Sequence, residues 1–427
     1  MIALLFVLLF ALMALGAPVW VAMATSGVAY VLIADLGEAT RLPTAMVDGV
    51  SGFELLAVPF FILTGDLMNR SGMTKRLIDL VLFFIGKVRG ALAYVSVSVS
   101  LFASGISGSA PADASAVSAV LMPAMREEGY RPTFAASVNA ASAIIGPIMP
   151  PSIPMIFVAL VTNLSVGQLF LGGVGPALLL TAILFVVLFL RGRHQPMPVA
   201  KPTERSFGSL RRLLSEALMA LVAPVIIVGG VLTGVATVTE LAFVASGYVL
   251  LVGILIYRTI SLRDLWGIFR DNAVFASTVM VLFAVVGIFS YIVAAERVGD
   301  DLATLVDGLD VGPVQFLLLA MVFFLVVGLV IDAVPAILIF APILLPAALD
   351  VGVDPIHFGV VIVVNLMIGL LTPPVGALLY VVSKVSQVSF VGLTRQVLPF
   401  VVALLGGLVI IVLVPEIVMW LPEAIFR

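Results

Sequence analysis

The sequence predicts an all-α polytopic membrane protein, built as an inverted repeat with two re-entrant hairpins and two broken helices. Three observations lead to this prediction. Of the 427 residues, 62% are hydrophobic and only 11% are charged, and apolar runs of about 20 residues, the length of a membrane span, recur along the chain. The two halves share a pattern of prolines and glycines. Corresponding segments of the two halves carry opposite charge.

Composition separates this chain from soluble proteins, in which roughly a quarter of the residues are charged. The opening "MIALLFVLLFALMALGAP" lacks the basic segment of a signal peptide, so we expect a first membrane helix there. Cysteine is absent, which excludes disulfides and thiolate metal sites. The two histidines, His194 and His357, are far apart in the sequence and are expected at surface or loop positions.

A basic segment, 191–214, divides the chain and predicts a cytoplasmic linker, since it carries six basic residues and one acid. Each half is expected to contain scaffold helices, a surface arm helix, a hairpin, a broken helix and a final helix. In the first repeat, 1–190, these are 1–69 (helices near 1–15, 18–34 and 53–69), 70–89, 91–125, 131–165 and 167–190. In the second repeat, 215–427, they are 215–294, 296–310, 313–349, 355–388 and 396–414.

The halves align without a gap at an offset of 223 residues. The matching prolines are Pro123 with Pro346, Pro132 with Pro355, Pro150 with Pro373, Pro151 with Pro374, and Pro176 with Pro399. All five prolines of the second window find a partner among the seven of the first, whereas random placement would match fewer than one. An internal duplication explains this better than shared apolar composition.

Charge gives the relative orientation of the two copies. The arm segment 70–89 has a net charge of +4, and its counterpart 296–310 has a net charge of −4. Short basic loops stay in the cytoplasm, so the two arms are expected on opposite faces of the membrane, as in the inverted repeats of secondary transporters. Threading the helices from these anchors places both termini in the periplasm. Ordinary loops are the alternative for both arms.

Four segments interrupt apolar stretches at membrane depth. The arms of hairpins 91–125 and 313–349 are about 14 residues each, shorter than the roughly 20 that a span needs. Their polar tips lie at 104–113 and 328–336, and the helix breaks at 146–152 and 371–376 carry Pro-Pro pairs; the break ranges are "GPIMPPS" and "LTPPVG". Irregular backbone in a membrane is tolerated where it lines a cavity, and freed carbonyls there coordinate cations.

We therefore expect two quasi-symmetric cation sites, each formed by a tip and the break of the same repeat, with an anionic substrate between the tips. The proposed ligands are the hydroxyls of Ser104, Ser107 and Thr372 and the carbonyls of Gly146, Met149, Gly328 and Pro373. Oxygen cages with few carboxylates suit sodium better than calcium. The alternative for the serines is close packing between helices.

Ionisable residues inside membrane segments are functional candidates. Asp332 lies at the second tip, so we expect a role near the second cation or in gating. Asp113 could cap the second helix of its hairpin, while Asp66 and Glu240 could simply reach water. Further candidates for substrate contact are Ser109, Ser152, Asn139 and Asn365.

Covalent chemistry and ATP hydrolysis are not indicated. The sequence contains no P-loop, no GxSxG motif and no cluster of histidine with carboxylates. We expect neither an enzyme nor a nucleic-acid-binding protein.

Four stretches carry a family likeness: "VPFFILTGDLMNRSGMTKRLIDL", "SGSAPADASAVSAVLMPAMREEGY", "GPIMPPSIPM" and "DPIHFGVVIVVNLMIGLLTPPVGALLYV". Over essentially the whole chain the sequence resembles the large membrane subunit of TRAP transporters, the DctM-like tripartite ATP-independent periplasmic family. The resemblance implies the elevator-type ion-transporter superfamily fold and sodium-driven import of an organic acid across the bacterial inner membrane. It implies two partners: a small four-helix membrane subunit (DctQ-like) and a periplasmic substrate-binding protein (DctP-like). The chain looks like the separate large subunit, embedded in membrane lipid.

The resemblance also assigns sodium ligands. The first site would use Ser104, Ser107, Gly146, Met149 and Pro150, and the second would use Gly328, Thr372, Pro373 and Gly376, with Asp332 nearby. The first tip departs from many members at Pro111, where they have Val or Thr.

The cargo implied by the family is a dicarboxylate, sialic acid, sugar acid or keto acid, with two or more sodium ions as coupling ions. A stand-alone sodium–dicarboxylate or citrate symporter, which shares the hairpins but needs no partners, is the alternative. A channel or an assembly subunit fits the inverted repeat poorly.

Overall fold

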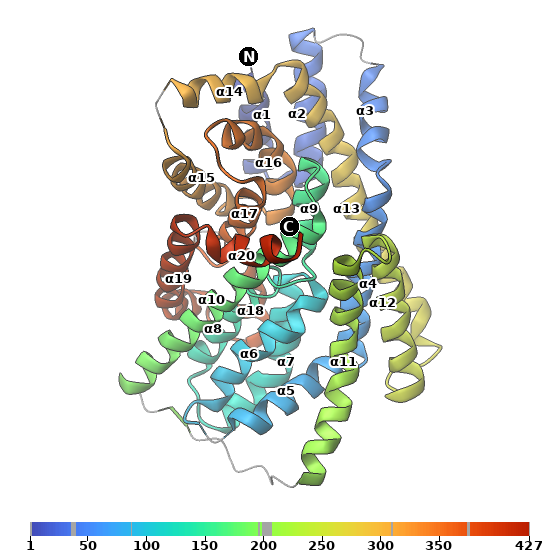
Figure 1. Cartoon of the computed structure of the whole chain (residues 1–427), viewed down its shortest axis with the longest axis vertical. Helices are drawn as coiled ribbons and strands as arrows, with labels where there is room; N and C mark the ends of the chain where they lie inside the picture. Colours follow the sequence, from blue (N-terminus) through green and yellow to red (C-terminus); the bar gives the residue numbers. More distant parts are fainter. Residues whose placement is uncertain are drawn as a thin grey trace.

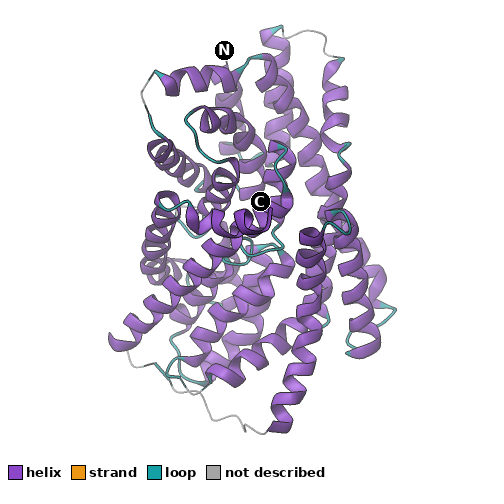
Figure 2. Cartoon of the chain, in the orientation of Figure 1, coloured by secondary structure: helices purple, strands orange, loops and turns teal. Residues whose placement is uncertain are grey.

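The structure is a computed structural model, and its described part forms helices and no strand (Figure 2). The description covers residues 2–35, 40–86, 88–194, 197–198, 207–308, 311–373 and 376–426. Within these ranges, the side chains at 103–107, 194, 207–209, 300, 305 and 307 lie outside the description.

The first half of the chain holds the elements up to the basic linker (Figure 1). They are α1 (Ile2–Ala14), α2 (Val19–Ala34), α3 (Arg41–Val50), the 3-10 helix η1 (Phe53–Leu56), α4 (Ala57–Arg70), α5 (Met73–Ile85), α6 (Ala91–Ser107), α7 (Ala110–Glu127), α8 (Pro132–Ala143), α9 (Ile153–Thr162) and α10 (Val166–His194).

The second half begins after the linker, most of which lies outside the described residues. Its elements are α11 (Phe207–Thr233), α12 (Val238–Leu251), the π-helical turn η2 (Val252–Ile256), α13 (Asp264–Ala295), α14 (Val298–Asp307), α15 (Pro313–Gly328), α16 (Ala333–Asp350), α17 (Pro355–Gly369), α18 (Ala377–Ser386), α19 (Phe390–Leu413) and α20 (Glu416–Phe426).

Among the described residues, six helices are long and apolar enough to cross a membrane, or seven when α3 and η1–α4, which meet at a bend of 55°, count as one span. The bend falls at Ser51 and Gly52, and Gly52 adopts an extended conformation with ψ of 125°. The sequence predicts no helix at α3 or at α20, so these two elements are additions to the expected set. The all-helical membrane fold is confirmed.

The element bounds follow the offset seen in the sequence. The second arms of the hairpins, α7 and α16, are both 18 residues long and start at Ala110 and Ala333, 223 residues apart. Both predicted arm segments contain a helix, α5 and α14, and Figure 1 shows these two at opposite ends of the long axis. The inversion relative to a membrane and the surface position of the arms stay predictions.

Each hairpin packs against both broken helices. Within the repeats, α6 packs on α8 and α15 packs on α17. Across the repeats, α7 packs on α18 and α16 packs on α9. The crossed packing joins the hairpins and broken helices into one body and brings both tips to its centre.

A second group of helices forms the expected scaffold, in which α3 packs on α13 and α4 packs on α12. The contact between α3 and α13 is made by glycines. A Cβ on Gly287 would lie 2.0 Å from the carbonyl oxygen of Ala45, and a Cβ on Gly49 would lie 2.5 Å from that of Phe283. Only glycine permits two helices to approach this closely.

The arm helix α5 is fixed to the scaffold by Arg76. Its guanidinium carbon lies 3.6 Å from the ring centroid of Tyr257, and its Nε lies 3.5 Å from a carboxylate oxygen of Glu216. Tyr257, just after η2, donates a hydrogen bond to the Glu216 carbonyl, and burial raises the pKa of its hydroxyl to about 12. These contacts hold α5 against α11 and η2.

His357 corrects one expectation, because it lies in the first turn of α17 with only 2% of its surface exposed. Its Nε2 lies 2.9 Å from the carbonyl oxygen of Ile411. The expected surface or loop position is wrong for His357, because a backbone carbonyl of α19 satisfies the ring in the interior. The side chain of His194 lies outside the described residues.

Candidate functional site

A cavity of about 590 Å³ lies where the two hairpin tips meet the scaffold. From the tips it is lined by Gly108–Ala112 and Asp332–Val334, and from the first break by Pro147, Ile153 and Pro154. The scaffold contributes residues of α4 and α13. The cavity therefore occupies the place where the sequence predicts the substrate.

The first tip touches the break of its own repeat. Gly108 has a φ of +58°, which favours glycine, and a Cβ there would lie only 2.9 Å from the backbone nitrogen of Ile153. Ser109 is the N-cap residue of α7 and lines the cavity. Ser104 and Ser107 belong by backbone to the last turns of α6, but their side chains lie outside the described residues.

The first break leaves carbonyls without partners. Between α8 and α9, residues 144–152 are non-helical, and the Pro150–Pro151 peptide bond is cis. Among the described residues, no hydrogen bond reaches the carbonyls of Gly146, Met149 and Pro150. Such carbonyls are available to a cation, as in other broken transporter helices.

Ser152 closes the break by capping α9. Its hydroxyl donates to the carbonyl of Pro147 and accepts from the backbone N–H of Met155 at 3.2 Å. This is the usual role of an N-cap serine. Ser152 is fully buried and is not among the residues that line the cavity.

The second tip also touches its own break, through glycine. A Cβ on Gly328, at the end of α15, would lie 3.3 Å from the Cα of Gly369 at the end of α17. Asp332 is the N-cap of α16, where its carboxylate accepts from the N–H of Ala333 at 2.8 Å, and its side chain is exposed to the cavity. An acidic group also suits the positive end of a helix.

The second break combines free and engaged groups. The Thr372 hydroxyl donates to the Ile368 carbonyl at 2.9 Å, which leaves its oxygen lone pairs able to accept a cation. Gly376 has a φ of +49°, and its carbonyl accepts from Leu379 and Tyr380, so it is already used by α18. Pro373 precedes Pro374 and Val375, which lie outside the described residues.

Asn139 and Asn365 join the broken helices to the hairpins. Asn139 accepts from the Ser96 hydroxyl at 2.5 Å and donates to that of Ser118 at 3.4 Å. Asn365 donates to the Met321 carbonyl at 2.8 Å. Both asparagines are fully buried and do not line the cavity, so their contacts in this structure are structural.

The other ionisable candidates have partners or caps. Glu240 completes a capping box with Thr237 at the start of α12. Asp113 is buried in the first turn of α7, where Ser109 and not Asp113 is the N-cap residue. Asp66, which could simply reach water, is bonded to Arg70 and Asn272 instead.

Sequence reasoning missed a polar group at the edge of the cavity, made by Asp66 and Arg70 of α4 and by Asp271 and Asn272 of α13. Asn272 Nδ2 lies 2.8 Å from Asp66, Arg70 Nε lies 3.0 Å from both Asp66 carboxylate oxygens, and Arg70 Nη2 lies 3.6 Å from Asp271. Arg70 read as part of the basic arm. Its distant partner, more than 200 positions along the chain, leaves no local signal.

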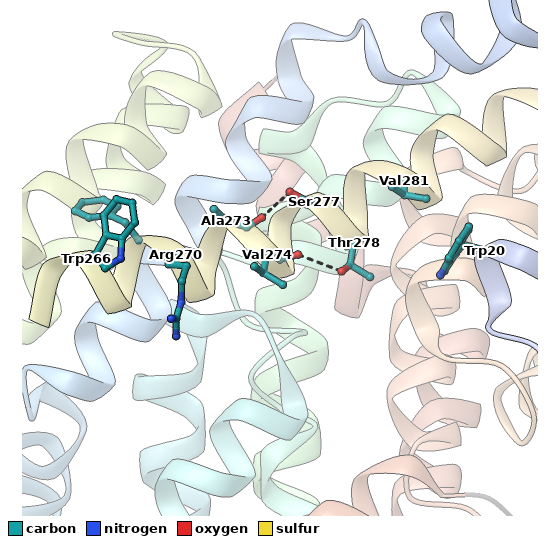
Figure 3. Close-up of a pocket in the computed structure, with 9 residues that line it drawn as sticks. Trp20, Trp266, Arg270, Ala273, Val274, Ser277, Thr278 and Val281 are labelled. Atoms are coloured by element: carbon teal, nitrogen blue, oxygen red, sulfur yellow. Dashed lines mark hydrogen bonds between the residues drawn. The ribbon is translucent and has the colours of Figure 1, made fainter.

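A larger groove, of about 760 Å³, runs along the outer face of α13 (Figure 3). Trp20 and Trp266 border it, and Arg270 projects from the same helix. The hydroxyls of Ser277 and Thr278 donate to the carbonyls of Ala273 and Val274, one turn earlier on the helix. The groove is apolar with satisfied hydroxyls, as expected for a face in contact with lipid.

Comparison with known proteins agrees with this architecture. The crystal structure of the Alcanivorax borkumensis YdaH transporter superposes with a TM-score of 0.64 over 88% of this chain and 89% of that one, at 16% sequence identity. This similarity supports a membrane-transporter fold.

Relatives of known name are closer in sequence. The sialic acid TRAP transporter large permease protein SiaM of Vibrio cholerae is 38% identical over 96% of this chain and 95% of its own length. The 2,3-diketo-L-gulonate TRAP transporter large permease protein YiaN of Escherichia coli is 35% identical, with 95% of each chain covered. The isethionate TRAP transporter permease protein DctMQ of Oleidesulfovibrio alaskensis is 33% identical over 95% of this chain but only 64% of its own length.

The family model for the DctM component of tripartite ATP-independent periplasmic transporters matches residues 6–417. Together with the apolar helices, this makes the chain a multi-pass protein of the bacterial inner membrane and a transporter subunit, not an enzyme. The resemblance seen in the sequence is confirmed: the chain belongs to the DctM family, the large permease component of TRAP transporters.

Proposed function

We propose that this chain is the large membrane subunit of a sodium-coupled, binding-protein-dependent secondary transporter that imports an organic acid by an elevator mechanism. The observation that carries the proposal is the central cavity, which is lined by both hairpin tips and by the first break. Relatives named for sialic acid and for 2,3-diketo-L-gulonate support an organic acid as the cargo.

Sodium coupling is supported by the unpartnered carbonyls beside the tips. The first site uses Gly146, Met149 and Pro150 together with Ser104 and Ser107. The second site uses the oxygens of Gly328, Thr372 and Pro373, with Asp332 supplying negative charge from the tip. Gly376 contributes less, because its carbonyl accepts hydrogen bonds within α18.

The cation sites and the cargo site share the tips, so their affinities are coupled. Sodium bound between a tip and a break fixes that tip, and the tip lines the cavity. An ion that raises the affinity for the acid must gain affinity for itself by the same factor when the acid is bound. The two hairpins and two broken helices would then move as one body against the scaffold helices.

Two partners complete the proposed transporter: a small four-helix membrane subunit and a periplasmic binding protein that delivers the acid. A relative in which the matching part spans 64% of a longer permease named DctMQ supports the first partner. Both termini of this chain are proposed to face the periplasm, with the basic linker in the cytoplasm.

Reconstitution tests the dependence on partners. Proteoliposomes would contain the chain with the small subunit, and the binding protein would be added outside with labelled sialic acid, 2,3-diketo-L-gulonate or succinate under an inward sodium gradient. We expect uptake of one acid only when all three proteins are present. Uptake by the chain alone would contradict the tripartite function and favour a stand-alone symporter.

A further inference from the structure

A chain of hydrogen bonds orients Arg70 at the edge of the central cavity. Nδ2 of Asn272 donates to the carbonyl of Ile268 and to Oδ2 of Asp66, both at 2.8 Å. Asp66 in turn accepts from Nε of Arg70 at 3.0 Å. Because Asn272 is only 8% exposed and is anchored on the backbone of α13, the Asp66 carboxylate and the Nε edge of the guanidinium are held in place.

The other edge of the guanidinium remains available. Nη2 lies 3.6 Å from Oδ2 of Asp271, which is too long for a hydrogen bond. Asp271 also accepts from Nη2 of Arg270 at 2.9 Å, so its charge is already shared. The side chain of Arg70 is 44% exposed and lines the cavity. A fork of N–H donors fixed on one edge and free on the other matches a carboxylate in geometry and charge.

Charge makes this arginine stand out. The charged residues among those that line the cavity are Asp66, Asp271, Asp332 and Arg70, so three acids accompany one base. An entering anion meets a net negative lining, and Arg70 is the fixed positive charge that favours it. Because α4 belongs to neither hairpin and to neither broken helix, this charge does not depend on the candidate sodium sites.

We propose that Arg70 binds a carboxylate of the transported acid through its Nη atoms, with Asp66 and Asn272 as positioning residues. The proposal rests on the proposed function in one respect, that the cargo is an organic anion. The scaffold thereby takes part in binding the cargo, beside the tips, and the acid displaces the weak contact between Arg70 and Asp271.

Charged thiol reagents test the positive charge of the cavity without knowledge of the cargo. The chain has no native cysteine, so Ala112→Cys, at an exposed position of the cavity lining, provides a single reporter. The purified chain would be labelled with the anionic 2-sulfonatoethyl and the cationic 2-(trimethylammonium)ethyl methanethiosulfonate, and the ratio of the two rates compared between variants.

We expect Arg70→Gln to lower the anionic-to-cationic rate ratio about fivefold or more, since one nearby unit charge is removed in a site of reduced dielectric. Arg70→Lys keeps the charge and should stay within about twofold of the parent ratio. Arg270→Gln is the matched control, because Arg270 pairs with the same Asp271 but lines the outer groove instead of the cavity. Equal ratios in Arg70→Gln and in the parent would overturn the proposal.

Transport separates this inference from the proposed function. In the complete transporter, with the acid that the wild type imports, Arg70→Gln should raise KM about tenfold or more, and Arg70→Lys should give an intermediate value because it lacks the planar fork. If the wild type imports the acid and the KM of Arg70→Gln is unchanged, this inference alone fails. If the wild type imports none of the acids, the proposed function fails, and the labelling ratio still decides whether Arg70 attracts anions.

Discussion

Gly328 and Gly369 meet backbone to backbone, at the point where the second hairpin tip touches the second broken helix. A Cβ on Gly369 would lie 3.1 Å from the Cα of Gly328, and a Cβ on Gly328 would lie 3.3 Å from the Cα of Gly369. Such contacts are tighter than ordinary side-chain packing, and the neighbouring atoms are backbone atoms that cannot rotate away. The proposed second sodium site depends on this approach, because it brings the Gly328 carbonyl close to the break.

Gly369→Ala should therefore damage the second site. Overpacking of this kind costs about 1–3 kcal/mol, so we expect a lower apparent melting temperature and a sodium concentration for half-maximal uptake that rises about tenfold. Gly406→Ala is the control, because no atom lies within 4 Å of a Cβ there. Equal sodium dependence in the two variants would show that the Gly328–Gly369 contact does not organise a cation site.

Thr372→Val tests the hydroxyl of the second break. The substitution keeps shape but removes the oxygen that is proposed to bind sodium and that now donates to the Ile368 carbonyl at 2.9 Å. We expect the sodium dependence of uptake to weaken about tenfold while the protein remains folded, as judged by its elution profile. Retention of wild-type sodium dependence would place the ion elsewhere.

Arg76→Ala should loosen the arm helix α5. The variant loses the contact with the Tyr257 ring and the pairing with Glu216, and a cation–π contact of this kind contributes about 0.5–2 kcal/mol. A fall of a few degrees in the melting temperature in detergent is expected. Lys75→Ala, at the exposed neighbouring position, should leave it nearly unchanged; an equal fall in both would argue against a specific role for Arg76.

Asp79, on α5, predicts a pH effect on stability. Burial raises the pKa of its carboxyl, and the nearby Lys75 opposes this only in part. A raised pKa in the folded state means that the folded protein binds the proton more tightly, so the charged carboxylate costs stability above that pKa, and the cost disappears below the unfolded value. Asp79→Asn should raise the melting temperature at pH 7 and have no effect near pH 3. A variant that is less stable at pH 7 would contradict this.

Much of the architecture could be predicted because its signals are local or repeated. Proline pairs mark the breaks, polar tips mark the hairpins, and the offset of 223 residues relates α7 to α16. α3 has a mixed composition, "RLPTAMVDGV", which gives no clear membrane span. His357 could not be placed, because its burial depends on the carbonyl of Ile411 in α19.

The site shows the same limit. Residues predicted from the tips and breaks, such as Asp332 and Ser109, do line the cavity. Asn139 and Asn365, chosen for polarity alone, are engaged in packing the hairpins. The cluster of Arg70 with Asp271 escaped notice because its members come from opposite halves of the chain and meet only in the folded protein.

Sodium coupling is the central claim, and one measurement tests it most directly. Uptake of the labelled acid by the complete transporter would be followed in proteoliposomes with an inward sodium gradient, with equal sodium on both sides, and with potassium in place of sodium. We predict accumulation above the outside concentration only with the inward sodium gradient, and loss of uptake in potassium. Accumulation that persists unchanged when potassium replaces sodium would contradict the account.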